Sequence, residues 1–377
     1  MELPQNLNSR IEQLQERNLL RKLPVFNNPV DFSSHDYIGF SKSESIFRDA
    51  HAYLLENEIF QNGFTGSRLI SGNHSLYTIT ENFIAEFHDA EAALIFNSGC
   101  HANLGFFSAV PQKKDVVLYD EFCHASIKDG LASNAKSYHY RHSDIEDLEQ
   151  HILKFPHTNI YIVTESVFSV DGDSPNLEEL VLLSEKYNCY LIVEESHALG
   201  VFGEKGEGLS QFLKFHDRIF ARIISFGKGL GCQGGAVLGS AALKEYLVNF
   251  AKTLIYTTAL SPHSVATIFT AYQHLETEKE TIGKLRENIL FFNQQKNLLG
   301  LKPMFVYSKS AIHTAIVPGN KNVKELEVQL QEKGFDVQSV LPPMVPEGQE
   351  RLRFCIHSYN SHEEIDQVLE LVRDFLF

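Results

Sequence analysis

Short apolar runs alternate with helical segments over residues 92–239. We interpret five of these runs as strands, at residues 93–96, 116–119, 159–163, 190–193 and 220–224. Apart from Asn159 and Arg222, the residues of these runs are apolar, a pattern typical of strands that are buried on both faces of a sheet. Because helical segments separate them, the pattern predicts an α/β fold with a mostly parallel central sheet flanked by helices.

The regions on either side carry a different pattern. An apolar stripe at helical spacing over residues 8–23 predicts a helix that ends before Pro24. Towards the other end, a long helical stretch over residues 264–298 leads into mixed strand and helix signals. We expect an N-terminal helix and connecting segment over residues 1–45, a large domain over 46–262, and a smaller C-terminal α+β domain over 263–377, with the N-terminal segment packing near it.

Polar residues gather directly after the predicted strands. These clusters lie at residues 97–99, 120–124, 165–173, 194–197 and 225–228. The carboxyl ends of parallel strands meet at one edge of a sheet, and ligands of such folds bind at that edge. We therefore expect the functional site there.

Lys228 stands out within the last of these clusters. A β-branched run leads into this lysine, which is set among glycines, and Ser225 lies three residues before it. A lysine amine can condense with a carbonyl to a Schiff base, which is how pyridoxal phosphate enzymes hold their cofactor. The glycines leave room for a cofactor ring, and Ser225 offers a hydroxyl to a phosphate. We interpret Lys228 as the catalytic centre.

Two other interpretations of this segment remain. One is a glycine-rich turn that carries a solvated lysine. The other is a dinucleotide fingerprint, which Gly229-x-Gly231-x-x-Gly234 matches. That fingerprint requires a helix directly after the glycines, whereas residues 235–239 have the pattern of a strand.

Composition and charge narrow the class of protein. The net charge of −15 disfavours a nucleic-acid surface, which depends on clustered lysine and arginine. No apolar run is long enough to span a bilayer, and the first residues lack the pattern of a signal peptide. We expect a cytoplasmic protein with no membrane or nucleic-acid partner.

The five cysteines are odd in number and scattered, which suits reduced thiols in the cytosol. Cys100 and Cys123 each precede a histidine directly. Ligand pairs of structural zinc sites usually lie two to four residues apart, so we predict no metal site.

Taken together, the motifs resemble those of the α-oxoamine synthases. The resemblance covers almost the whole chain, through residues 31–39, 66–74, 124–130, 165–173, 194–200 and 225–229. Members of this family are fold-type-I enzymes that depend on pyridoxal 5'-phosphate (PLP) and join an amino acid to an acyl-CoA with loss of carbon dioxide. The resemblance implies a PLP-dependent acyltransferase that forms a homodimer with its active site at the subunit interface.

The resemblance also implies roles for residues around the cofactor ring. Lys228 would hold the cofactor and act as base, and His124 would stack on the pyridine ring. Glu194 would stand beside the ring nitrogen, where an opposite charge keeps the nitrogen protonated. His197 would form a hydrogen bond with the phenolic oxygen of the cofactor, and Ser169 would lie near the cofactor ring.

Further residues are implied for the phosphate and for the substrates. The phosphate would meet the backbone amides of Gly99 and Cys100, the Ser225 hydroxyl and Thr258 of the neighbouring subunit. The implied substrate residues are Arg353 for the amino acid carboxylate, Arg21 (or Lys22 in its place) for a distal carboxylate of the acyl chain, and Met344 at a position that contacts substrate.

Within the family the chain looks most like the members that act in the biotin pathway, through residues 254–263 and 342–348. Their substrates would be L-alanine and a pimeloyl thioester on CoA or a carrier protein. Several residues depart from the family pattern: His35 for asparagine, Cys100 for an aromatic residue, Glu194 for aspartate, Ser196 for alanine and Met344 for threonine. Two alternatives follow, a related synthase that uses glycine, serine or another amino acid with a different acyl chain, and a PLP-binding protein without turnover.

Overall fold

The computed structural model describes residues 3–17, 19, 20, 23, 29–132 and 135–377. The chain divides into two compact units. The smaller unit comprises Met1–Ser34, Val170–Gly172 and Glu287–Phe377, and the larger unit comprises His35–Ser169 and Asp173–Arg286.

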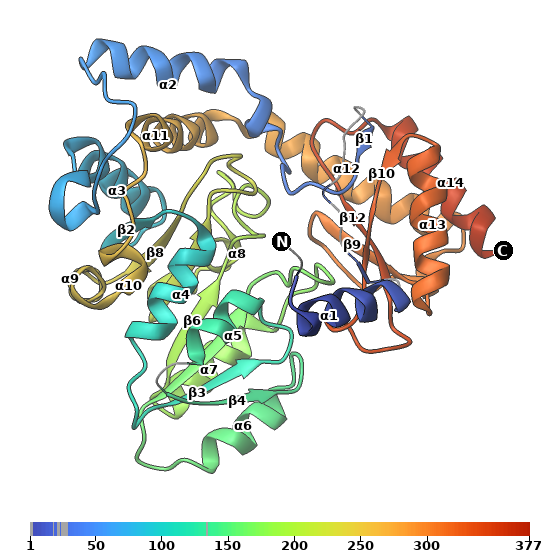
Figure 1. The fold of residues 1–377 in the computed structure, drawn as a ribbon, viewed down its shortest axis with the longest axis horizontal. Helices are drawn as coiled ribbons and strands as arrows, with labels where there is room; N and C mark the ends of the chain where they lie inside the picture. Colours follow the sequence, from blue (N-terminus) through green and yellow to red (C-terminus); the bar gives the residue numbers. More distant parts are fainter. Residues whose placement is uncertain (1–2, 18, 21–22, 24–28, 133–134) are drawn as a thin grey trace. The chain divides into compact units, whose positions relative to one another are not determined.

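A seven-stranded sheet forms the centre of the larger unit, in the order β2-β8-β7-β6-β5-β3-β4 (Figure 1). Its strands are β2 (Ala92–Phe96), β3 (Val116–Asp120), β4 (Lys136–Tyr140), β5 (Ile160–Glu165), β6 (Tyr190–Glu194), β7 (Ala221–Ser225) and β8 (Gly235–Gly239). Neighbours are parallel except at β8, which is antiparallel to both β2 and β7. The prediction of a mostly parallel sheet is therefore confirmed. Since β8 follows the glycines after Lys228, the dinucleotide interpretation, which needs a helix there, is wrong.

The sequence pattern missed β4 as a strand. Four of its five residues are exposed, and only Tyr140 is buried. The strand lies at the edge of the sheet, beside β3 alone. An edge strand of this kind lacks the continuous apolar run that marks the central strands.

Helices cover both faces of this sheet. They are α2 (Glu44–Glu56), α3 (Ser75–Phe87), α4 (Gly99–Ala109), α5 (Ala125–Leu131), α6 (Ile145–Leu153), α7 (Leu177–Lys186), α8 (Leu209–Phe212), α9 (Ala241–Phe250), α10 (Lys252–Ile255) and α11 (Pro262–Thr277). Val117 of β3 packs in one apolar cluster with Phe106 of α4. The next residue, Leu118, packs in a second cluster with Leu180 of α7. Because successive side chains of a strand point to opposite faces, the two clusters are the two layers of the core.

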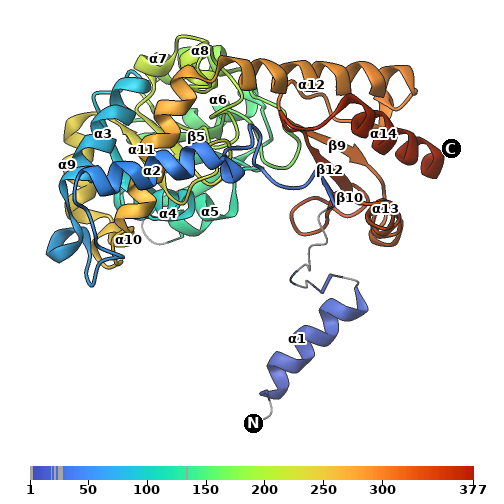
Figure 2. The same ribbon diagram turned by 90° about the horizontal axis from the view of Figure 1, so that it is seen from above.

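The smaller unit contains an antiparallel sheet in the order β11-β12-β9 and a parallel pair of β1 with β10. Figure 2 shows its long helices α12 and α14 together with α13. The elements are α1 (Gln5–Glu16), β1 (Val30–Asp31), α12 (Lys279–Leu298), β9 (Ile312–Ile316), α13 (Asn320–Glu332), β10 (Phe335–Asp336), β11 (Gln338–Val340), β12 (Arg351–Cys355) and α14 (His362–Leu376), with the division between the units falling inside α12.

Two helix predictions differ from the structure. The N-terminal helix is shorter than the stripe over residues 8–23, because α1 ends at Glu16. The stretch over residues 264–298 holds two helices, α11 and α12, which Glu278 separates. None of the helices in the described part of the chain combines the length and hydropathy needed to cross a bilayer.

Candidate active site

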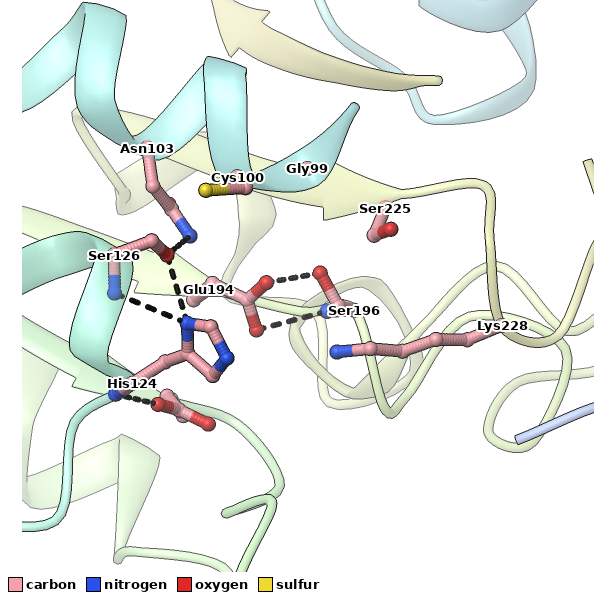
Figure 3. A pocket seen from close by; sticks show the side chains of 10 residues that line it. Gly99, Cys100, Asn103, His124, Ser126, Glu194, Ser196, Ser225 and Lys228 are labelled. Atoms are coloured by element: carbon pink, nitrogen blue, oxygen red, sulfur yellow. Dashed lines mark hydrogen bonds between the residues drawn. The ribbon is translucent and has the colours of Figure 1, made fainter. Parts of the chain in front are cut away.

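A cavity of about 90 Å³ opens at the carboxyl ends of the strands of the larger unit (Figure 3). Its lining residues are Gly99, Cys100, Asn103, His124, Ser126, Glu165, Glu194, Ser196, Ser225 and Lys228. Each of them ends or follows one of the strands β2, β3, β5, β6 and β7. The edge of the sheet that the sequence marked therefore carries a cavity lined by polar groups.

The side chains of Lys228, His197 and Tyr37 are linked in a row by hydrogen bonds. Its Nζ lies 2.8 Å from Nε2 of His197, and Nδ1 of His197 lies 2.6 Å from the phenolic oxygen of Tyr37. His197 is 2% exposed and Tyr37 is fully buried. Packing fixes both rings, so the amine is held at one place on the cavity wall. Sequence reasoning assigned no role to Tyr37, although this residue stands within the motif over residues 31–39.

Glu194 ends β6 and is held by Ser196. The Ser196 hydroxyl donates to Oε1 of Glu194, and its backbone N–H donates to Oε2 across 3.1 Å. Glu194 is 5% exposed and Ser196 is fully buried. These bonds turn the Glu194 carboxylate back toward the backbone of its own loop and fix its orientation.

Glu165 is a second buried carboxyl group of the cavity. It ends β5 and pairs in register with Glu194 of β6. Its Oε1 accepts a hydrogen bond of 2.6 Å from the backbone N–H of His124. Burial and the nearby charge of Glu194 raise the pKa of Glu165. The sequence offered only the position of Glu165, a carboxylate at a strand end.

His124 occupies the N-cap position of α5. Its Nδ1 accepts from the backbone N–H of Ser126 at 3.2 Å and lies 2.7 Å from the Ser126 hydroxyl. The Ser126 hydroxyl in turn accepts from the side-chain amide of Asn103 at 3.1 Å. Burial and the charge of Lys228 lower the pKa of His124. Sequence patterns did not single out Ser126 or Asn103.

The N-terminus of α4 forms the opposite wall. Ser98 caps this helix by accepting from the backbone N–H of His101 at 3.1 Å. Gly99 lies so close to Ser225 that a Cβ added to Gly99 would come within 2.6 Å of the Ser225 Cβ. The first N–H groups of a helix lack intrahelical acceptors and favour an anion. The amides of Gly99 and Cys100 and the Ser225 hydroxyl thus form a cradle suited to a phosphate.

The remaining residues expected from the resemblance are not among those that line the cavity in the larger unit. Ser169 is half-buried beyond β5, and its backbone bonds Glu165. Thr258 is exposed, and its carbonyl accepts from Asn97 of the same chain at 2.7 Å. Arg353, on β12, and the exposed Met344 belong to the smaller unit. Arg21 and its substitute Lys22 lie outside the described residues.

Comparison with known proteins places this chain in a family. The family model for aminotransferase class I and II matches residues 28–372. An 8-amino-7-oxononanoate synthase of Emericella nidulans is 36% identical, and the alignment covers 99% of this chain and 96% of that protein.

Solved structures agree with that placement. The 8-amino-7-oxononanoate synthase of Francisella tularensis has a TM-score of 0.78 at 28% identity, covering 93% of this chain and 98% of that one. The serine palmitoyltransferase of Sphingomonas wittichii has a TM-score of 0.89 at 26% identity, covering 98% and 96%. A structure of SPT with PLP has a TM-score of 0.88 at 25% identity. The match covers 98% of this chain and 96% of that one.

The fold is that of the fold-type-I PLP-dependent transferases, as the resemblance implied. These relatives and structural neighbours are acyltransferases of the α-oxoamine synthase type. The chain belongs to the aminotransferase class I and II family and, within it, to the α-oxoamine synthases.

Proposed function

We propose that this enzyme is an 8-amino-7-oxononanoate synthase of biotin biosynthesis. It condenses L-alanine with a pimeloyl thioester, on CoA or a carrier protein, and yields 8-amino-7-oxononanoate, carbon dioxide and the free thiol. The observation that carries the proposal is the placement of the Lys228 amine, 2.8 Å from His197, on a cavity that also contains Glu194 and the N-terminus of α4. Support comes from relatives of that name over nearly the full chain.

The residues of the cavity fit PLP. The amides of Gly99 and Cys100 with the Ser225 hydroxyl suit its phosphate, and the buried Glu194 suits its ring nitrogen. The close approach of Gly99 to Ser225 leaves no room for a side chain at position 99, so the cradle requires glycine. When bound there, PLP would supply a carbonyl for the Lys228 amine and an electron sink for the carbanion of the amino acid.

The chain's own residues would then divide the work. Lys228 would hold the cofactor and would remove the proton from Cα of the amino acid, a role that suits an amine held near a cationic group. Tyr37 holds His197 by a hydrogen bond, and His197 would in turn orient the Lys228 amine. His124 would cover the cofactor ring, and Ser169 would lie near that ring.

Substrate binding would involve further parts of the chain. Arg353 would bind the amino acid carboxylate with its bidentate guanidinium. Arg21 would bind the distal carboxylate of the pimeloyl chain, and Met344 would contact substrate. The exposed Thr258 would reach the phosphate of a second copy in a homodimer. All five cysteines are free of disulfides, and we place the reaction in the cytoplasm.

A second candidate is a related synthase that takes serine or glycine. Serine palmitoyltransferases are among the structural neighbours. Met344 lacks the hydroxyl that the biotin-pathway members carry at the matching position, and its side chain is 51% exposed. This candidate shares Lys228, Glu194 and His197 with the first, so only the choice of substrates separates the two.

The test is the product formed by the PLP-loaded protein from L-alanine and pimeloyl-CoA. Mass spectrometry should detect 8-amino-7-oxononanoate with wild-type protein and none with Lys228→Ala. If the same protein makes an aminoketone only from serine or glycine with another acyl-CoA, the second candidate replaces the first. Absence of any aminoketone from a protein that binds PLP would contradict both.

A further inference from the structure

His124 is held by hydrogen bonds at its backbone and at one ring nitrogen (Figure 3). Its backbone N–H donates to Oε1 of Glu165 at 2.6 Å. Its Nδ1 meets two groups of Ser126, the backbone nitrogen at 3.2 Å and the hydroxyl oxygen at 2.7 Å. The opposite ring nitrogen, Nε2, lies in Figure 3 on the side of the ring turned toward Lys228. The orientation of the ring is thus set by its neighbours before any ligand binds.

The direction of these hydrogen bonds follows from which groups can donate. A backbone N–H only donates, so the bond from Ser126 N–H requires a lone pair on Nδ1. The Ser126 hydroxyl accepts from the Asn103 side-chain amide at 3.1 Å, which leaves its own proton to donate to Nδ1. Two donors therefore converge on Nδ1, and the single proton of a neutral imidazole must lie on Nε2.

The opposite arrangement is unfavourable. If Nδ1 carried the proton, it would face the backbone N–H of Ser126, donor against donor at 3.2 Å. The N-cap of α5 would also be lost, because His124 caps that helix through Nδ1. Asn103 and Ser126 are each 3% exposed, so water cannot easily replace either partner. An unmade bond at such a site is costly.

We propose that Asn103 and Ser126 are positioning residues that lock His124 as the neutral tautomer with its proton on Nε2. The ring then presents an N–H to the cavity rather than a lone pair. It can donate a hydrogen bond to an oxygen of the substrate, either a carboxylate or a thioester carbonyl. It cannot act as a base while Ser126 holds Nδ1. The tautomer is a property of the chain alone and does not depend on which substrates the site takes.

The direct test is ¹⁵N NMR of protein labelled at histidine, with and without PLP. The chain has 17 histidines, so the signals of His124 are assigned by their loss in His124→Asn. We expect the Nδ1 signal at a shift typical of an unprotonated nitrogen, and the Nε2 signal at one typical of a protonated nitrogen, near neutral pH. A protonated Nδ1 in the wild-type protein overturns the proposal, whatever the enzyme's activity.

Variants test the two positioning residues. Ser126→Ala and Asn103→Ala should each move the His124 signals toward a mixture of tautomers and lower kcat roughly fivefold, the effect of one lost hydrogen bond. Ser126→Thr keeps the hydroxyl and should restore both the signals and kcat. Ser184→Ala is the matched control, because Ser184 is equally buried and bonds a carbonyl on α7.

The two readouts separate positioning from a general loss of stability. If Ser126→Ala lowers kcat and leaves the ¹⁵N signals of His124 unchanged, Ser126 does not act through the tautomer and the proposal fails. If Ser184→Ala shifts the same signals, the change reflects general destabilisation and the proposal also fails. The proposed reaction would fail separately, through the absence of product from a protein whose His124 has the expected tautomer.

Discussion

Ser196 donates two hydrogen bonds to the carboxylate of Glu194, one from its hydroxyl and one from its backbone N–H (Figure 3). From the resemblance described above, we expected aspartate and alanine at these two positions. Only a hydroxyl at position 196 can make the first bond. The serine therefore holds the glutamate carboxylate in place, and we predict that the two residues act together.

A double-mutant cycle tests this link. Ser196→Ala should weaken PLP binding roughly fivefold, because Glu194 loses a charge-assisted hydrogen bond. In the Glu194→Asp background the same change should have a smaller effect, because the shorter side chain does not need the hydroxyl. Equilibrium dialysis with absorbance detection gives the four affinities. Equal losses in both backgrounds would show that the two residues act independently.

Lys228 provides the clearest test of cofactor attachment. Lys228→Ala removes the amine that would bond the cofactor, so the protein should lose its cofactor absorbance on dialysis. Lys113→Ala, an exposed lysine at a distance from the cavity lining, is the control and should keep it. Cofactor absorbance retained by Lys228→Ala after dialysis would assign the attachment to another residue.

Tyr37 should matter through His197. Tyr37→Phe keeps the ring and removes the oxygen that lies 2.6 Å from Nδ1 of His197. We expect kcat to fall roughly tenfold while PLP is retained, because a lost buried partner costs about 1–2 kcal/mol. Tyr140→Phe is the matched control, since its hydroxyl is also buried and hydrogen-bonded, to the Val163 carbonyl, but Tyr140 is not among the residues that line the cavity. Equal effects of the two substitutions would remove the special role of Tyr37.

His142 should make the stability of the protein depend on pH. Its ring nitrogens lie 2.9 Å from Asp120 and 2.8 Å from Asp173. Burial alone would lower the pKa of His142, but the bonds and charges of the two carboxylates outweigh burial and raise it to about 10. The added stability is thus fully present below the unfolded value of about 6.5 and is lost as pH rises through 10.

The variant for this test is His142→Gln. It should lower the free energy of unfolding by about 2 kcal/mol at pH 6, a value reduced for the partly solvated ring. The difference between wild type and variant should shrink steadily from pH 6.5 to 10, as urea unfolding at several pH values would measure. A difference that stays constant over this range would mean that His142 is not charged in the native state.

The central sheet could be predicted from the sequence because its strands are buried on both faces. Val117 and Leu118 are both apolar since each meets a different layer of helices. Strand β4 does not need apolar residues on both faces, because four of its five residues are exposed. Its sequence therefore lacks the apolar run that would have predicted a strand.

Part of the site could be predicted in the same way, because Lys228, Glu194 and His197 follow strands and stand in family motifs. Ser126 and Asn103 act through a hydrogen bond between α4 and α5, and a contact between elements leaves no periodic trace in the sequence. Glu165 lies beside Glu194 because β5 and β6 are neighbours in register, which only the topology shows. The expected role of Thr258 concerns a second copy of the chain, and no single chain can display it.

The most direct measurement of the central claim is the rate of free thiol release from pimeloyl-CoA by PLP-loaded protein, with L-alanine, glycine and L-serine compared side by side. An 8-amino-7-oxononanoate synthase should release thiol fastest with alanine, and Lys228→Ala should release none. Release that depends on serine or glycine instead would contradict the choice of substrate. Absence of release with all three, from protein that has bound PLP, would contradict the proposed reaction itself.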